Sequence, residues 1–156
     1  MEILTEIDKA YIAGFFDGEG CISISKYQGK NNRTPVYSLQ VVIVQKGIDT
    51  LAALYNLTKI GTIHSRDKYH PDTYEWHIPR LDAVDFLTAI LPYLRNKKME
   101  AEVAIEYQEK QGRQHFTGLG YTVSPEHIAE KEMYYQKLHK LKGTSSIGRG
   151  RPVKSP

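Results

Sequence analysis

The chain has 156 residues, of which 40% are hydrophobic and 25% charged, enough for one domain with a real core and short for two. A single cysteine, Cys21, excludes an intrachain disulfide, and no apolar run is long enough to predict a membrane span or a secretory leader. We therefore expect a soluble intracellular protein, from a bacterial or phage cytoplasm or from an organelle, with no membrane partner.

The formal net charge of +3 is unevenly distributed. The first twenty residues hold five acids against one lysine, residues 21–70 hold seven bases against two acids, and the last twenty hold six bases and no acid. This pattern predicts a polyanionic partner, with local cation chemistry near the N-terminus. A merely solvated basic surface is the alternative that composition leaves open.

The first predicted element is a helix over residues 5–17. Thr5 and Asp8 have the spacing of a capping box, and the apolar positions follow a helical period. Part of the apolar stripe consists of small residues, which let another backbone approach closely. Glycine inside a helix costs about 1 kcal/mol relative to alanine, so its presence there indicates a packing reason. The small residues therefore predict a close helix–helix contact; they are Ala10, Ala13 and Gly14.

Beyond Gly20 the period of the apolar residues changes to two. Residues 22–27 and 36–45 read as an antiparallel hairpin with a long basic connection, and residues 62–68 and 73–79 as a second hairpin. A short helix over 48–57 separates them.

Three further helices are expected, over 80–91, 97–111 with Asn96 as cap, and 125–142 with Ser124 as cap. The order αββαββα plus C-terminal helices predicts an α+β fold. Helices would cover one face of a saddle-shaped sheet, mixed or antiparallel, and leave the other face open, polar and basic. We expect a domain over 1–143 and a basic, flexible tail over 144–156.

The stretch DGEG places Asp17 and Glu19 at the end of the first helix. The carbonyl end of a helix disfavours negative charge. A bound divalent cation would make negative charge favourable there, because carboxylates and free carbonyls are the ligands of Mg²⁺. Phosphodiester hydrolysis uses such ions. A simple turn is the alternative, since Asp and Gly both favour turns.

Two other features point toward DNA. An open antiparallel sheet can lie in the major groove, where alternate side chains reach base edges, although any half-exposed sheet alternates in the same way. The C-terminal hexad GRGRPV is similar to the core of an AT-hook, which would put Arg149 and Arg151 in a narrow minor groove. The six histidines lack the spacing of a metal site.

Residues 12–20, IAGFFDGEG, resemble the motif that names the LAGLIDADG homing endonucleases, and the elements around them match its context. In that family the motif helices of two subunits or half-domains pack together. The motif occurs once here, which implies a homodimer acting on a near-palindromic target. The interface would include Ala10, Ala13, Gly14 and Asp17.

The resemblance also implies roles at the reaction centre. Glu19 matches the metal-binding acid, the Gly18 carbonyl would complete that side, and Asp17 would be mainly structural. Gln45 would order water near the scissile phosphate, and Lys97 would stabilise charge there. Asp49 falls near a position that is basic in the family, which is a departure. The residues expected to contact DNA are Ser23, Ser25, Tyr27, Lys30, Arg33, Ser38, Gln40, Val42, Lys46, His64, Arg66, Lys68, Glu75 and His77, with Arg149 and Arg151 of the tail.

The implied activity is intron homing by a Mg²⁺-dependent DNA endonuclease that cuts both strands of double-stranded DNA and leaves short 3′ overhangs. Mn²⁺ would substitute, and Ca²⁺ would support binding without cleavage. The alternatives are a maturase that binds intron RNA, a non-cleaving DNA-binding regulator of the same fold, and a dimeric scaffold.

Overall fold

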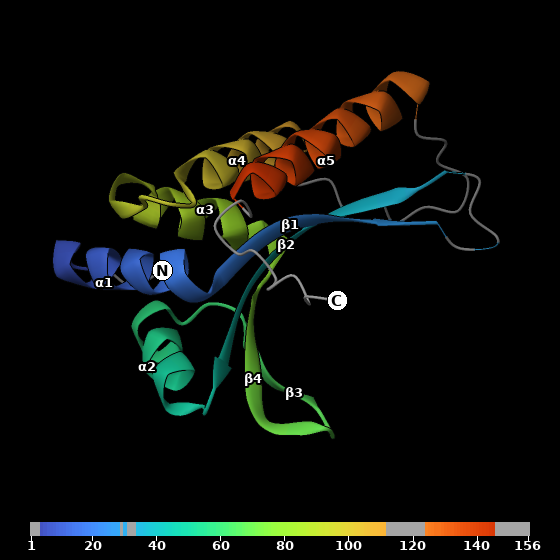
Figure 1. The fold of residues 1–156 in the computed structure, drawn as a ribbon. Coiled ribbons are helices and arrows are strands. Elements are labelled where there is room, and N and C mark those ends of the chain that lie inside the picture. Colours follow the sequence, from blue (N-terminus) through green and yellow to red (C-terminus); the bar gives the residue numbers. More distant parts are fainter. Residues whose placement is uncertain (1–3, 29, 31–33, 112–123, 146–156) are drawn as a thin grey trace, which may run out of the picture.

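The computed structural model describes residues 4–28, 30, 34–111 and 124–145. The elements follow the predicted αββαββα order and continue with two helices (Figure 1). They are α1 (Glu6–Glu19), β1 (Gly20–Tyr27), β2 (Val36–Lys46), α2 (Asp49–Thr58), β3 (Thr62–Asp67), β4 (His70–Ile78), α3 (Arg80–Ile90), the 3-10 helix η1 (Leu91–Tyr93), α4 (Lys98–Gln111) and α5 (Pro125–Ser145).

The four strands form one sheet in the order β1-β2-β4-β3, and each pairing within the described residues is antiparallel. Of the two sheet types that the sequence analysis allowed, mixed or antiparallel, the structure has the antiparallel one. β2 and β4 are the second strands of the two αββ units. They lie side by side in the sheet. A rotation of 180° about an axis between them exchanges these equivalent strands and reverses their direction, so their pairing is antiparallel.

The core lies between the sheet and the helices. Alternate strand residues are buried, as the period of two predicts: Ile22 and Ile24 in β1, Tyr37, Leu39, Val41 and Ile43 in β2, and Trp76 and Ile78 in β4. The indole N–H of Trp76 donates to the Ile60 carbonyl over 2.8 Å, so the largest buried side chain is also satisfied. Within the described residues, no helix is long and apolar enough to cross a membrane.

Helix boundaries differ from the predictions for identifiable reasons. α1 continues to Glu19, so both carboxylates of DGEG lie in its last turn. α4 begins at Lys98, and the Lys97 carbonyl accepts the backbone N–H of Ala101 at 2.9 Å, so Lys97 occupies the cap position that was predicted for Asn96. α5 runs to Ser145, so it includes the first two residues that we had assigned to the tail.

Helix α5 is fastened to the first hairpin by a network centred on Glu132. Its Oε2 accepts hydrogen bonds from the Tyr37 hydroxyl and from Lys26 Nζ, the latter at 2.7 Å, and its Oε1 accepts from Gln136 Nε2 at 2.8 Å. These donors lower the pKa of Glu132 to about 2, with Gln136 contributing most. The ionised carboxylate therefore helps to hold α5 against β1 and β2.

This network predicts a pH dependence of stability. Because the folded pKa of Glu132 lies below its ordinary value, its contribution is complete above about pH 5 and is lost as the pH falls toward 2. Glu132→Gln should therefore lower the melting temperature at pH 7, and the difference from wild type should shrink as the pH falls. Thermal unfolding of both proteins across this range is the measurement. A difference that stays constant would contradict the assignment.

Candidate active site and DNA-binding face

The site begins where α1 gives way to β1. Thr5 and Asp8 form the predicted capping box at the start of the helix, with the Asp8 N–H donating to Thr5 Oγ1 over 3.2 Å. At the other end, a Cβ on Gly20 would lie 2.6 Å from the Phe16 carbonyl oxygen. Only glycine therefore permits this close turn from helix to strand. The turn fixes the position of Glu19, the last residue of α1.

Asp17 organises the start of α4. Its carboxylate accepts the backbone N–H groups of Arg95 at 2.7 Å, Asn96 at 3.2 Å and Lys97 at 3.0 Å. Asn96 was predicted to cap this helix with its side chain. The backbone N–H groups before α4 are instead accepted by Asp17, about eighty positions earlier. These contacts lie within one chain, and they support the structural role proposed for Asp17 from the sequence.

Lys97 and Glu19 are brought to the same end of α1. Lys97 Nζ donates to the backbone carbonyl of Asp17, two residues before Glu19. Glu19 itself is exposed, and within the described residues its carboxylate makes no hydrogen bond or ion pair. A carboxylate left open beside a lysine and helix-terminal carbonyls can accept a cation.

Gln45 lies at the end of β2, on the same face as Ile43, whose Cα partner is Gly20. Its position is therefore at the edge of the core beside the end of α1, and not on the outer face of the sheet. In this structure its Oε1 accepts the N–H of Lys46 at 3.0 Å.

One further acid is buried at the start of α4, the segment that Asp17 and Lys97 join to the end of α1. Glu100, in the first turn of α4, is only 7% exposed. Burial raises the pKa of Glu100, the charges of Lys142 and Lys97 oppose that rise, and Asp17 adds to it. The sequence analysis had not identified Glu100 or Lys142.

The residues present suit a hard cation only in part. Within the described residues, no group of three or more His, Cys, Asp and Glu side chains could hold a metal. The exposed Glu19 carboxylate and the Gly18 carbonyl are nevertheless the oxygen ligands that Mg²⁺ takes, and Mg²⁺ completes its shell with water and phosphate oxygens. A complete Mg²⁺ coordination shell would therefore need oxygen ligands that one chain does not supply.

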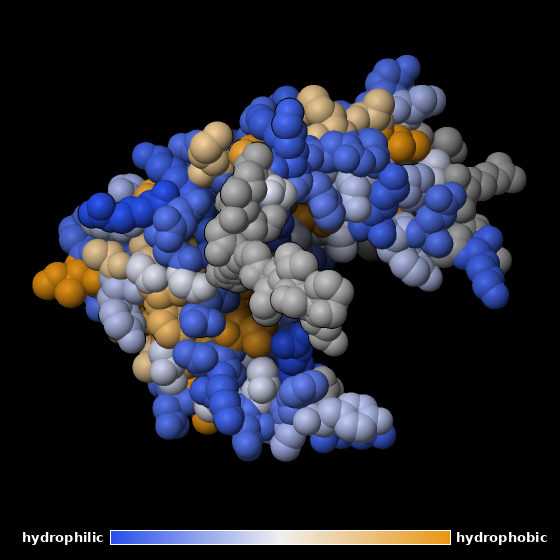
Figure 2. Space-filling view, viewed as in Figure 1, coloured by the Kyte–Doolittle hydropathy of each residue, from blue (hydrophilic) through white to orange (hydrophobic). Residues whose placement is uncertain are grey.

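The outer face of the sheet gathers the polar residues predicted for DNA contact. The register places Val42 between Cys21 and His77, and pairs His64 with Glu75. Strand alternation then puts one face together: Ser23, Ser25 and Tyr27; Ser38, Gln40 and Val42; Glu75 and His77; and Thr62, His64 and Arg66. Figure 2 shows the hollow between the two hairpins, with hydrophilic residues around it.

Some of these side chains already have partners. Arg66 Nε lies 3.2 Å from Glu75 Oε1, and His77 Nε2 lies 3.2 Å from Glu75 Oε2. Glu75 thus offsets the charge of Arg66. The exposed lysines at the margins of this face are Lys30 in the first connection, Lys46 at the end of β2 and Lys68 in the turn before β4. Asp49 is exposed in the first turn of α2, where the helix dipole favours an acid.

The predicted contact stripe on α1 is shifted by the structure. Ala13 is fully buried in the chain's own core, which removes it from the exposed stripe. Ala10 and Gly14 are exposed, and Ile7 and Tyr11 beside them are 81% and 54% exposed. Large apolar side chains at such exposure mark an interaction surface when they form a stripe.

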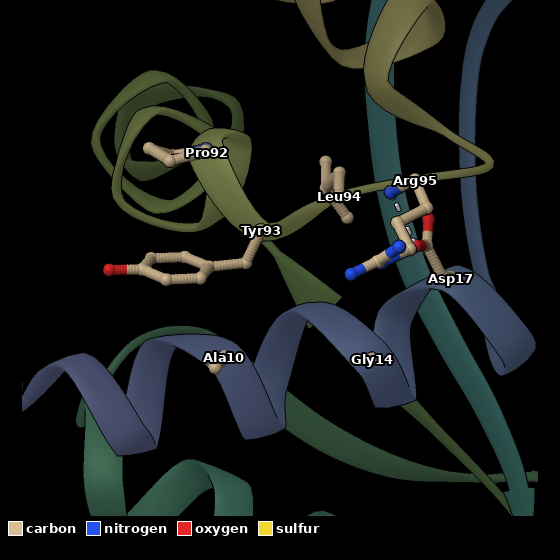
Figure 3. Close-up of a pocket in the computed structure, with 7 residues that line it drawn as sticks. All are labelled: Ala10, Gly14, Asp17, Pro92, Tyr93, Leu94 and Arg95. Atoms are coloured by element: carbon tan, nitrogen blue, oxygen red, sulfur yellow. Dashed lines mark hydrogen bonds between the residues drawn. The ribbon is translucent and has the colours of Figure 1, made fainter.

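A groove of about 420 Å³ adjoins this stripe. It lies between α1 and the segment that follows α3 (Figure 3) and is lined by Ala10, Gly14, Asp17, Pro92, Tyr93, Leu94 and Arg95. The predicted contact surface of α1 is therefore continuous with a concave surface from a different part of the chain. Arg33, Arg149 and Arg151, predicted to contact DNA, lie outside the described residues.

Solved structures share this fold. The homing endonuclease I-CvuI in complex with its target aligns with a TM-score of 0.71 at 20% identity, covering 86% of this chain and 82% of that one. The archaeal intron-encoded homing endonuclease I-Vdi141I, complexed with DNA, gives 0.73 at 19%, covering 87% and 84%. The group I intron-encoded homing endonuclease I-CeuI, also complexed with DNA, gives 0.68 at 17%, covering 92% and 71%.

No curated protein sequence matches the chain. The family model described as LAGLIDADG endonuclease matches residues 12–111, which is more than half of the sequence. That span begins at the motif and ends with α4, and so includes Glu19, Gln45 and Lys97. The chain therefore belongs to the LAGLIDADG endonuclease family.

Proposed function

We propose that this protein is a site-specific double-strand DNA endonuclease that acts as a homodimer, with Glu19 as its metal-binding acid. The observation that carries the proposal is the end of α1. There Glu19 presents an exposed carboxylate that has no partner within the described residues, and Lys97 Nζ contacts the Asp17 carbonyl two residues earlier. The strand that follows belongs to the open polar sheet face. Family membership and the fold support the same conclusion.

Each residue of the proposed site would have a distinct role in the reaction. Glu19 and the Gly18 carbonyl would hold a divalent ion, which supplies charge stabilisation to the attacked phosphate and lowers the pKa of a bound water. Lys97 would stabilise negative charge at the phosphate, and Asp17 positions Lys97 through its backbone. Gln45 would orient water at the edge of the site.

The sheet face would supply recognition. Short polar side chains such as Ser23, Ser38 and Gln40 can reach base edges in the major groove, whereas Lys30, Lys46 and Lys68 at the margins would contact phosphates. The neighbours I-Vdi141I and I-CeuI are described as complexed with DNA, which supports this assignment.

A second copy would complete the site. The α1 stripe of Ile7, Ala10, Tyr11 and Gly14 is apolar or small and exposed, which suits close packing of two α1 helices. Such packing would bring two Glu19 side chains near each other and place one reaction centre on each strand. A symmetric pair of identical chains then reads a near-palindromic sequence.

Gly14 offers a direct test of the homodimer. A Cβ on Gly14 meets nothing within 4 Å in one chain, so Gly14→Leu should not disturb the fold, and removing glycine from a helix favours it. The larger side chain should block close approach of a second α1 and give the mass of a monomer by sedimentation. Gly143→Leu in α5 is the control, since its Cβ also meets nothing, and it should leave the mass unchanged.

The endonuclease proposal is tested by selection from a randomised duplex library. Wild-type protein is first used with Ca²⁺ to retain bound duplexes, and Mg²⁺ is then added. We expect the retained sequences to be near-palindromic and to break when Mg²⁺ is present. Retention without breakage would favour the regulator. Preference for intron RNA over every duplex would favour the maturase, and no retention at low salt would favour the scaffold.

A further inference from the structure

The last turn of α5 reaches the reaction centre from the far end of the chain. Lys142 Nζ donates to Cys21 Sγ over 3.1 Å, across 121 positions of sequence. Cys21 is exposed, lies two residues beyond Glu19, and pairs with Val42 on the outer face of the sheet. Because β1 is the edge strand, the Lys142 side chain can pass around that edge to the open face.

A second observation relates Lys142 to Lys97. Both lysines act electrostatically on the buried carboxylate of Glu100, which lies in the first turn of α4. Lys97 in turn contacts the end of α1 through the Asp17 carbonyl. Both ammonium groups therefore act on one buried acid, and Lys97 does so from the end of α1 that presents Glu19.

The local partner of Lys142 leaves most of its hydrogen-bonding capacity unused. Within the described residues, its hydrogen bond goes to a thiol sulfur, which is a weak acceptor. An ammonium has three donors on a flexible stem, and a phosphate oxygen is a far stronger acceptor for it. A phosphate oxygen would therefore be a better partner for this ammonium than the Cys21 sulfur.

We propose that Lys142 is a positioning residue that binds the DNA backbone phosphate beside the reaction centre, on the same side as Glu19. It would act together with Lys97, which contacts the end of α1. This inference rests on the proposed function, because it requires that the outer sheet face receives a duplex. A purely structural alternative is that Lys142 only anchors α5 to β1.

The test measures how DNA affinity depends on salt. The probe is a duplex recovered from the randomised library with wild-type protein and Ca²⁺, and the variants are Lys142→Met, Lys142→Gln and Lys142→Arg. Losing one phosphate contact per chain should reduce the slope of log K against log salt by about 0.9, or about 1.8 for a dimer. Lys142→Arg keeps the charge and should keep the slope.

Lys140→Met is the matched control, because it removes one positive charge from an exposed position of the same helix. It should leave the slope unchanged. A wild-type slope in both Lys142→Met and Lys142→Gln, with wild-type protein binding and cutting normally, would overturn this inference and leave the proposed function intact. A lower melting temperature with an unchanged slope would establish the anchor alternative. Failure of the wild-type protein to retain any duplex would refute the proposed function itself.

Discussion

Replacing Glu19 with glutamine is expected to abolish DNA cleavage while binding in Ca²⁺ changes little. Charge stabilisation by a bound metal is worth several kcal/mol, and each 1.4 kcal/mol is a factor of ten in rate. We therefore expect the single-turnover cleavage rate to fall by at least about a thousandfold. Since Glu19 is exposed and has no partner within the described residues, its replacement should not alter the fold.

The matched control is Glu102→Gln, which neutralises an exposed carboxylate on α4. This variant should cut and bind like wild type. Cleavage by Glu19→Gln at the wild-type rate would show that another residue holds the metal. Loss of both binding and cleavage would show instead that Glu19 contributes to docking of the duplex.

Removing the Asp17 carboxylate is expected to cost more stability than removing that of Glu19. Asp17→Ala takes the charged acceptor from three backbone N–H groups, those of Arg95, Asn96 and Lys97. Because the first two of these residues are exposed, water replaces part of the lost interaction. We expect the free energy of unfolding to fall by about 2–3 kcal/mol, in the upper range for a lost helix cap.

Chemical denaturation at one fixed protein concentration measures this loss, since association also contributes to stability. Asp17→Asn keeps one carbonyl oxygen and should lose less. Asp85→Ala, which removes an exposed carboxylate from α3, should change stability little. A wild-type midpoint for Asp17→Ala would contradict the structural role and would direct attention to Asp17 as a ligand.

The sequence alone was sufficient to predict those structural features that depend on residues close together in the chain. The capping box of Thr5 and Asp8 and the change to a period of two after Gly20 are both confirmed, and alternate residues of β2 such as Leu39 and Val41 are buried as that period requires. Their signals depend on spacings of two to four residues, which a single sequence displays directly.

Contacts between distant segments could not be predicted in this way. The support of α4 by Asp17 and the reach of Lys142 to Cys21 join residues about 80 and 121 positions apart. Ala13 looked equivalent to Ala10 and Gly14 by size, yet its side of α1 faces the core. Which side of an amphipathic helix meets its own sheet depends on packing, and size alone does not reveal it.

The central claim is that Glu19 lies in a reaction centre that cuts both strands of a bound duplex. The most direct measurement maps the two cut positions, strand by strand, on a duplex recovered from the library and treated with wild-type protein and Mg²⁺. We predict one break in each strand near the centre of the near-palindrome, offset to leave short 3′ overhangs. An intact duplex, or breaks offset to leave 5′ overhangs, would contradict the account.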